Sequence, residues 1–141
     1  MTRQIINPPT LAAPVGFNHG ILVTGGRLLF LAGQDASDAE GRIVAPGDLL
    51  AQFEQVLRNL QAVVEVAGGT MQDIVKLNVY VTDRDAYRAN LKPLGERFRA
   101  HFGSYYPAMA LFEVSGLFQE DALIEMEGFA VIGSSEAPDE L

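Results

Sequence analysis

The stretch DLLAQFEQVLRNLQAVVEVAGGTMQDIVKLNVYV, residues 48–81, contains the two strongest structural signals in the chain. Its first half has apolar residues at the spacing of one helical face, namely Leu49, Leu50, Phe53, Val56, Leu57, Leu60, Val63, Val64 and Ala67. Asp48 can cap the start of this helix, and Gly68-Gly69 can end it in a left-handed conformation that other residues resist. Residues 74–81 then alternate between apolar and polar side chains, which predicts a strand.

The sequence before this stretch predicts a β-hairpin. Apolar runs at residues 20–24 and 28–32 flank Gly25-Gly26-Arg27, and glycines between two apolar runs are typical of a tight turn. Residues 35–47 are polar and contain glycine and proline, so we expect a loop that leads into the helix.

The sequence after this stretch predicts an interrupted helix. Thr82-Asp83 offers a cap, but Pro93 lacks the N–H group and the space that a helix interior requires. We therefore expect a short turn that ends at about Asn90 and a second helix that begins at about Lys92. The buried positions of this region are expected to be Tyr87, Leu91, Leu94, Phe98 and Phe102.

Residues 108–114 and 123–132 predict the last two strands. In the second of these, even-numbered residues from Ile124 to Ile132 would point towards the helices, and odd-numbered residues, which include Glu125 and Glu127, would point away. Much of that second face is also apolar, so we expect other subunits to cover it.

These elements follow one another in the order ββαβαββ. Helices that return the chain to one sheet predict an α+β fold, with one β-sheet and two helices packed on one face. We expect a single domain over residues 1–132, followed by a disordered acidic tail at 133–141.

Composition argues against several classes of function. The formal net charge is −8, so the average surface repels phosphates, and we expect no nucleic-acid partner. The chain has no cysteine, which excludes disulfides and a thiol nucleophile. It also lacks both an apolar segment of roughly 18 residues and the apolar core of a signal peptide, so we expect a cytoplasmic protein without a membrane partner.

Common catalytic motifs are missing from the sequence. It contains no glycine-rich phosphate loop, no Gly-x-Ser-x-Gly segment and no His-Glu-x-x-His segment. His19 and His101 are the only histidines, too few for a histidine-rich metal site, so we expect no bound metal.

Several polar residues remain open to a functional or a structural interpretation. His19 could act as a general base, although a structural hydrogen bond is the more frequent role. Glu125 lies in an apolar strand, where it either activates water in a cleft or is paired structurally. Gln34 and Asn90 fit turns as well as ligand contacts, and Tyr105 could line a pocket or pack within its loop.

Several segments share their order and spacing with one known family. They are LFLAGQ at 29–34, the helix at 52–68, DIVKLNVYVTD at 73–83, Pro107-Ala108, Glu113-Val114 and IEME at 124–127. On these segments the chain resembles the RidA/YjgF family, once described as translation inhibitors or endoribonucleases, from about residue 14 to residue 132.

The resemblance implies a chorismate-mutase-like fold and a homotrimer with ligand clefts between subunits. Active members hydrolyse imines and enamines to a carbonyl compound and ammonia, without a cofactor. Their arginine after Pro-Ala binds the substrate carboxylate, and Met109 occupies that position here. The family's glycine-proline-tyrosine segment corresponds to Val15-Gly16-Phe17, so the tyrosine hydroxyl is missing. Gln34, Asn90 and Glu125 align with cleft positions.

We therefore expect a Rid-like protein that binds a small organic molecule in an intersubunit cleft and hydrolyses an imine, an enamine or a related C–N bond. Glu125 would position water and His19 would relay protons. The expected ligand contacts are Phe17, Gln34, Asn90, Tyr105 and Met109.

The alternative is a non-catalytic binding or regulatory protein, because Met109 and Phe17 replace polar groups of the family. If carboxylate recognition is retained without the arginine at position 109, the candidate substitutes are Arg27, Arg88 and Lys92.

Overall fold

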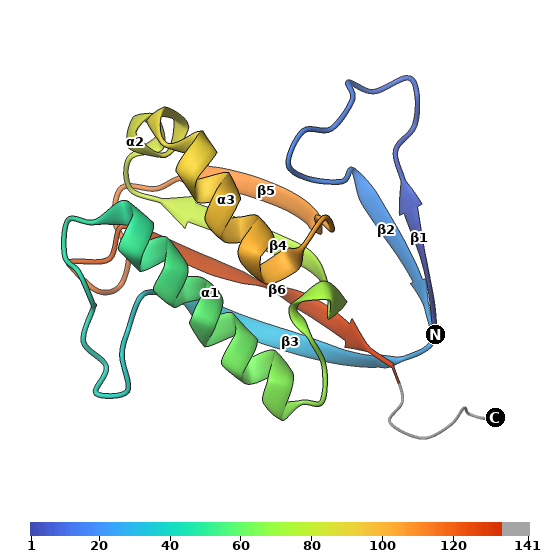
Figure 1. Cartoon of the computed structure of the whole chain (residues 1–141), viewed down its shortest axis with the longest axis horizontal. Helices are drawn as coiled ribbons and strands as arrows, with labels where there is room; N and C mark the ends of the chain where they lie inside the picture. The colour runs from blue at the N-terminus through green and yellow to red at the C-terminus, as the bar shows by residue number, and fades with distance from the viewer. Residues whose placement is uncertain (134–141) are drawn as a thin grey trace.

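The computed structural model describes residues 1–133, so all of the predicted disordered tail except Gly133 lies outside the described residues. Helices α1 and α3 cover one face of the main sheet (Figure 1). The elements in chain order are β1 (Thr2–Ile6), β2 (Gly20–Thr24), β3 (Arg27–Gln34), α1 (Leu49–Val66), the 3-10 turn η1 (Met71–Asp73), β4 (Ile74–Val81), α2 (Arg84–Ala89), α3 (Leu91–Phe102), β5 (Ala108–Glu113) and β6 (Ile124–Ile132).

The main sheet has four strands in the order β3-β6-β4-β5. Strand β6 is antiparallel to both β3 and β4, whereas β4 and β5 are parallel. Parallel neighbours need a crossover connection, and here α2 and α3 make it. The prediction of an α+β fold with two main helices on one face of a sheet is confirmed.

Helix α1 begins and ends close to the predicted residues. The Asp48 side chain accepts a hydrogen bond of 3.0 Å from the Ala51 backbone N–H, which caps the first turn. Gly68 follows the helix with a φ of 91°, in the left-handed conformation expected of it. The predicted apolar face is buried at Phe53, Val56, Leu57, Leu60 and Val64.

One polar side chain of α1, Gln52, is also fully buried. Its amide nitrogen donates to the carbonyl oxygens of Ala45, at 3.2 Å, and Asp121, at 3.1 Å. Its amide oxygen accepts a bond of 2.9 Å from the Leu123 N–H. Burial of an amide is costly unless it is hydrogen-bonded. These bonds satisfy the Gln52 amide and connect the loop before α1 to the turn before β6.

The second helical region is interrupted as predicted. Helix α2 ends at Ala89, α3 begins at Leu91, and Asn90 lies between them. Pro93 is in the first turn of α3, where a missing N–H removes no helical hydrogen bond. Leu91 is 58% exposed, which corrects the prediction that it is buried.

The predicted hairpin of residues 20–32 is wrong. Strand β2 pairs antiparallel with β1, a strand that the sequence analysis missed, while β3 pairs with β6. The two pairs belong to separate sheets, and Figure 1 shows β1 and β2 apart from the main sheet. Gly25 and Gly26 have φ values of 77° and 84°, so the chain turns there in a conformation that favours glycine. Such glycines predict a turn, but not the strand with which each run pairs.

The face of the main sheet opposite the helices is uncovered in the single chain. In β6 the side chains of Ile124 and Met126 are fully buried, as predicted, whereas Phe129 on the other face is 41% exposed. Phe30 of β3 is 69% exposed and meets Phe129 edge to face, with ring centroids 5.4 Å apart. We name this surface the open face; its residues are Phe30, Asn78, Tyr80, Glu125, Glu127 and Phe129.

Candidate functional site

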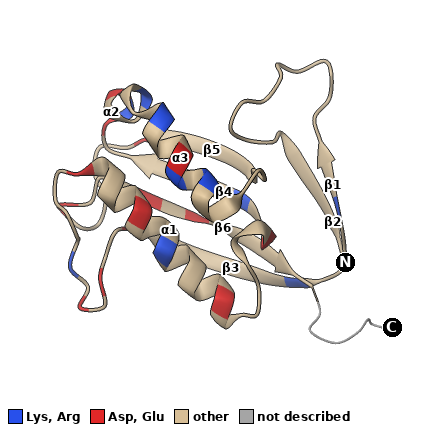
Figure 2. Ribbon diagram, viewed as in Figure 1, with Lys and Arg blue, Asp and Glu red and all other residues tan. Residues whose placement is uncertain are grey.

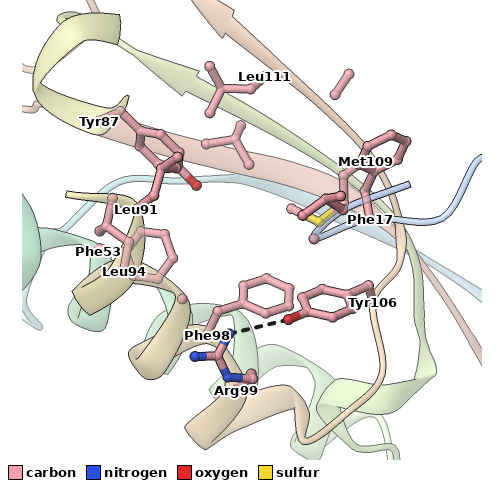
Figure 3. Close-up of a pocket in the computed structure, with 15 residues that line it drawn as sticks. Phe17, Phe53, Tyr87, Leu91, Leu94, Phe98, Arg99, Tyr106, Met109 and Leu111 are labelled. Carbon is pink, nitrogen blue, oxygen red and sulfur yellow. Dashed lines mark hydrogen bonds between the residues drawn. The ribbon is translucent and has the colours of Figure 1, made fainter. Parts of the chain in front are cut away.

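A cleft of about 510 Å³ lies on the helix side of the molecule, between α3 and the edge strand β5. Loop 15–17, α2, α3 and β5 supply most of its walls (Figure 3). Phe53 of α1 and Val79 of β4 also line it, and both are almost fully buried, so they form its deepest part. Cavities of about 300–1,000 Å³ are typical of small-molecule sites, and this one is of that size.

Aromatic rings of α2, α3 and residue 106 form much of one wall. The Phe98 ring stacks on Phe102, with centroids 4.1 Å apart, and on Tyr106, with centroids 5.4 Å apart. Burial raises the pKa of Tyr87 to about 12, so its hydroxyl stays neutral near pH 7. Rings held in this way offer flat apolar surface to a ligand.

Two of the predicted ligand contacts, Phe17 and Met109, line the cleft. Met109 is paired with Leu77 of β4, whose side chain is in the core, so Met109 also points to the helix side of the sheet. Phe17 comes from the loop before β2. That loop is attached to the start of β5 by a hydrogen bond of 3.0 Å from the Asn18 N–H to the Pro107 carbonyl oxygen.

Three other predicted residues form hydrogen bonds within the chain and do not line the cleft. The Tyr105 hydroxyl donates to the Ile74 carbonyl oxygen at 2.7 Å, and it is the adjacent Tyr106 that lines the cleft. Burial raises the pKa of Tyr105 to about 12. The His19 ring donates from Nε2 to the Ala12 carbonyl oxygen at 2.7 Å. The Asn90 amide donates to the carbonyl oxygen of Ala86 at 2.7 Å.

Glu125 lies on the open face, on the opposite side of the sheet from Met109. It is paired in register with Tyr80, just as Glu127 is paired with Asn78. Partial burial, together with the negative charges of Asp35 and Glu127, raises the pKa of Glu125 above its usual range. Within one chain, therefore, the sheet separates this carboxylate from the cleft.

Glu127, in contrast, has a fixed partner. It accepts a hydrogen bond of 2.6 Å from the Tyr80 hydroxyl, and this bond raises the pKa of Tyr80. A paired carboxylate of this kind is explained by structure alone.

Gly33 explains why Glu125 can lie across the end of β3. A Cβ atom at position 33 would overlap the Oε2 atom of Glu125, so any side chain there would displace the carboxylate. Gln34 follows directly and is paired with Met126 after an irregularity in the β3–β6 register. Gln34 and Glu125 therefore lie at the same end of this strand pair.

Arg99, the charged residue of the cleft lining, was not predicted from the sequence. The three cations considered there, Arg27, Arg88 and Lys92, are not among the lining residues. Arg27 instead donates to the Gly133 carbonyl oxygen at 3.1 Å. The available signal was helical spacing, since Arg99 follows Leu91 and Gly95 at four-residue intervals on one face of α3.

Within residues 1–133 no group of three or more histidine, aspartate or glutamate side chains is arranged to hold a metal ion. None of the helices in the same residues is long and apolar enough to span a membrane.

The fold and the cleft define a class: small α+β domains with an apolar cleft beside the edge strand of a mixed sheet. The sequence model of the family described as Endoribonuclease L-PSP matches residues 9–132. A RutC family protein from Pyrococcus abyssi is 34% identical over 131 residues, which cover 92% of this chain and 98% of that protein. The chain belongs to this family, known as the RidA/YjgF or Rid family.

Two solved structures show the same relationship. YyfB from Yersinia pestis, a Rid family protein of unknown function, is 38% identical, with a TM-score of 0.83 over 94% of this chain and all of that chain. RidA from a Psychrobacter species is 32% identical, with a TM-score of 0.65 over 92% of this chain and 99% of that chain.

Proposed function

We propose that this Rid family protein binds a small, mainly apolar organic molecule in the cleft between α3 and β5, and that a homotrimer completes the site for imine or enamine hydrolysis. The observation that supports this most directly is the cleft itself, which is about 510 Å³ and lined by Phe17, Phe98, Met109 and other apolar side chains. A ligand that fills it would lose most of its contact with water.

The trimer is proposed from the open face. The adjacent rings of Phe30 and Phe129 are exposed there in the single chain, and exposed aromatic rings of this kind on a sheet favour contact with another subunit. The cleft is adjacent to the edge strand β5, so a neighbouring subunit can reach it from the side. In this arrangement the cleft of one subunit and the Glu125 carboxylate of the next form one site.

The proposed chemistry is the addition of water to a C=N bond. The water oxygen bonds to the imine carbon, the C–N bond then breaks, and the products are a carbonyl compound and ammonia. Glu125 orients the water and removes its proton; a carboxylate with a raised pKa is a stronger base for this step than an ordinary one. His19, whose ring is bonded to the Ala12 carbonyl oxygen, relays protons only if that bond opens.

A non-catalytic binding protein is the second candidate. Within the described residues, no carboxylate and no histidine lines the cleft, so a single chain offers a binding site without a base. Ribonuclease activity is not proposed, because a net charge of −8 opposes the approach of RNA phosphates.

The first experiment measures hydrolysis of 2-imino acids that an amino-acid oxidase generates from alanine, leucine and phenylalanine. Semicarbazide traps the remaining imine, and loss of semicarbazone reports hydrolysis. We expect acceleration for the leucine and phenylalanine imines that exceeds any for alanine, because the cleft is apolar. No acceleration by a folded trimer, together with thermal stabilisation by an apolar ligand, would support the binding protein instead.

A second experiment tests whether two subunits share the site. Met109→Trp fills the cleft and Glu125→Gln removes the base, so each variant alone should be inactive. When the two are co-expressed and mixed at random, about a quarter of the interfaces combine two intact halves and should recover activity. Mixed trimers with no activity would show that the site is not divided in this way.

A further inference from the structure

Arg99 is the one charged side chain among the residues that line the cleft. It follows Phe98, whose ring forms part of the aromatic wall, and its guanidinium lies beside Tyr106 in Figure 3. The remaining lining is apolar apart from the hydroxyl groups of Tyr87 and Tyr106. Arg99 is itself exposed, so its guanidinium is hydrated in the free chain and is open to an anionic partner at the side of the cleft.

The chain itself supplies no such partner within residues 1–133. Figure 2 shows acidic and basic residues on both α1 and α3, and neighbouring cations there do form ion pairs. Arg58 and Arg97 lie 3.0 Å and 3.9 Å from Glu54. Arg99 forms no ion pair in this part of the chain, and its contact with the Tyr106 hydroxyl, at 3.4 Å, is long for a hydrogen bond.

The direction of the Arg99 side chain argues against a role at the end of the helix. A cation in the last turn of a helix can offset the negative end of the helix dipole. The Arg99 Nη1 atom, however, lies only 3.0 Å from where a Cβ of Gly95 would be. The side chain therefore runs back towards the start of α3, away from the free carbonyl groups, and covers a glycine beside the cleft.

We propose that Arg99 binds the carboxylate of a ligand whose aromatic or branched aliphatic body occupies the cleft. This inference rests on the proposed function of the same cleft, and it names the class of ligand: an apolar monocarboxylate such as a 2-oxo or 2-imino acid with a large side chain. The planar guanidinium can donate two parallel hydrogen bonds to a carboxylate, and the Tyr106 hydroxyl is close enough to donate a third.

A phosphate group fits the same surroundings less well. It carries up to two negative charges and more acceptor oxygens than a carboxylate, and phosphate sites gather several cations or backbone N–H groups. The described lining of this cleft contains a single guanidinium. The first residue of α3, Leu91, also lines the cleft, but it lies roughly 12 Å along the helix axis from Arg99, so the two cannot hold one phosphate together.

The position of Arg99 also sets the orientation of the ligand. In the family pattern the anchoring arginine follows Pro-Ala at the start of β5, where this chain has Met109. Here the anchor is on α3, across the cleft from β5 (Figure 3). The carboxylate end of the ligand therefore lies beside Phe98 and Tyr106, and its apolar end extends towards Met109 and Leu111.

The test compares phenylacetate with phenylacetamide, which has nearly the same shape without the charge. Binding is measured by isothermal titration and by the NMR shift of the ¹³C-labelled Met109 methyl group in the full-length protein. We expect phenylacetate to bind about tenfold to a hundredfold more tightly than the amide, the range for a hydrogen bond to a charged group. Arg99→Gln should abolish this difference, because it weakens binding of the acid far more than binding of the amide.

Arg97→Gln is the matched control. It removes another arginine of α3, and that arginine already has a partner within the chain, Glu54. It should preserve the preference for the acid, and Arg99→Lys should retain part of it. A preference that persists in Arg99→Gln, or equal binding of acid and amide by the wild type, would overturn the assignment of Arg99 while the cleft remains a binding site. Tighter binding of phenyl phosphate than of phenylacetate would overturn the carboxylate class.

If neither phenylacetate nor phenylacetamide shifts the Met109 methyl signal, the cleft is not the binding site. That result would reject the proposed function and the inference together. Phenylacetamide therefore distinguishes failure of the proposed function from failure of the Arg99 assignment. Its binding requires the cleft but does not require the charge of Arg99.

Discussion

The two faces of the main sheet differ in what they lack. On the helix side there is a formed cleft with apolar walls and one cation, Arg99, and among residues 1–133 no carboxylate or histidine lines it. The open face has carboxylates at Glu125 and Glu127 but only a small recess beside Phe30 and Glu127, and it exposes large apolar side chains. The proposed binding cleft and the proposed base, Glu125, are thus separated by one layer of β-sheet in each chain. A site that needs both must use two subunits.

The largest expected effect tests the open face as the source of the base. Glu125→Gln should reduce kcat for imine hydrolysis by about 10²–10⁴-fold, the usual contribution of a general base. Phenylacetate should still bind, because the contacts proposed for it, Arg99 and the apolar walls of the cleft, are all retained in this variant. Glu127→Gln is the control, since Glu127 is already paired with Tyr80. Equal losses in the two variants would show that the charge of this face matters and not Glu125 itself.

A pair of phenylalanine substitutions tests what covers each face. Phe98→Ala removes a ring that is 6% exposed, so the free energy of unfolding, measured by denaturant titration, should fall by about 3–5 kcal/mol. Phe30→Ala removes a ring that is 69% exposed in one chain, and it should chiefly weaken the trimer. The melting temperature of the Phe30→Ala variant should then fall on dilution, and analytical ultracentrifugation should show species smaller than a trimer. A monomeric wild type, or a fully stable trimer of Phe30→Ala, would contradict the covered open face.

The third prediction adds a second cation to the cleft. Met109→Arg places a guanidinium on the β5 wall and should increase the rate of hydrolysis of the alanine-derived 2-imino acid at low substrate by about tenfold, through one more charge-assisted hydrogen bond. Met109→Gln, polar but uncharged, is the control. If Met109→Arg has no effect in a folded trimer, the cleft does not orient small imino acids from its β5 wall.

The smallest expected effects concern pH and differ in sign between the two sides. Partial burial and the charges of Asp35 and Glu127 raise the pKa of Glu125, so the folded chain holds this proton more tightly than the unfolded chain. Stability is therefore lost as the pH rises from the ordinary carboxyl pKa through the raised one, and Glu125→Gln should raise the melting temperature at pH 7 more than at pH 4.

Glu54, on the helix side, should behave in the opposite way. Partial burial raises its pKa, but hydrogen bonds from His101 and Arg58 outweigh this and bring it below the ordinary value. Its contribution to stability is present above the ordinary pKa and is lost as the pH falls through the lowered one. Glu54→Gln should therefore lower the melting temperature at pH 7 and have little effect in strong acid. Parallel pH profiles for the two variants would contradict these assignments.

Much of the fold follows from local patterns. Local signals predicted the ends of α1, the break at Asn90 and the two faces of β6. Apolar spacing, capping residues and proline each affect only the few residues next to them in the sequence, so their effects can be predicted from the sequence alone. The partner of β2 was not predictable in this way. Strand pairing is decided between distant segments, and the glycines at 25 and 26 are compatible with a hairpin as well as with a change of sheet.

The site was predicted less completely. Phe17 and Met109 were found through the family resemblance, and both line the cleft. The choice between Tyr105 and Tyr106 depends on the path of a loop that has no periodicity. Arg99 was missed because nothing local distinguishes a cation that lacks a carboxylate partner from one that has it; Arg97, two residues away, is paired. Strand alternation shows that Glu125 and Met109 lie on opposite faces of the sheet. It shows this only when the order and register of the strands are known, and the sequence did not supply them.

Part of the cleft wall comes from a segment that lies outside the main sheet and its helices. Loop 15–17 connects β1 to β2, which form a sheet of their own, and the next residue, Asn18, attaches it to the start of β5 by an isolated bridge to Ala108. Residues in this loop can therefore be exchanged, or the loop lengthened, with little cost to the core. Diversity of ligand preference among related chains is expected to accumulate here first, as it does in recognition loops carried on a constant scaffold.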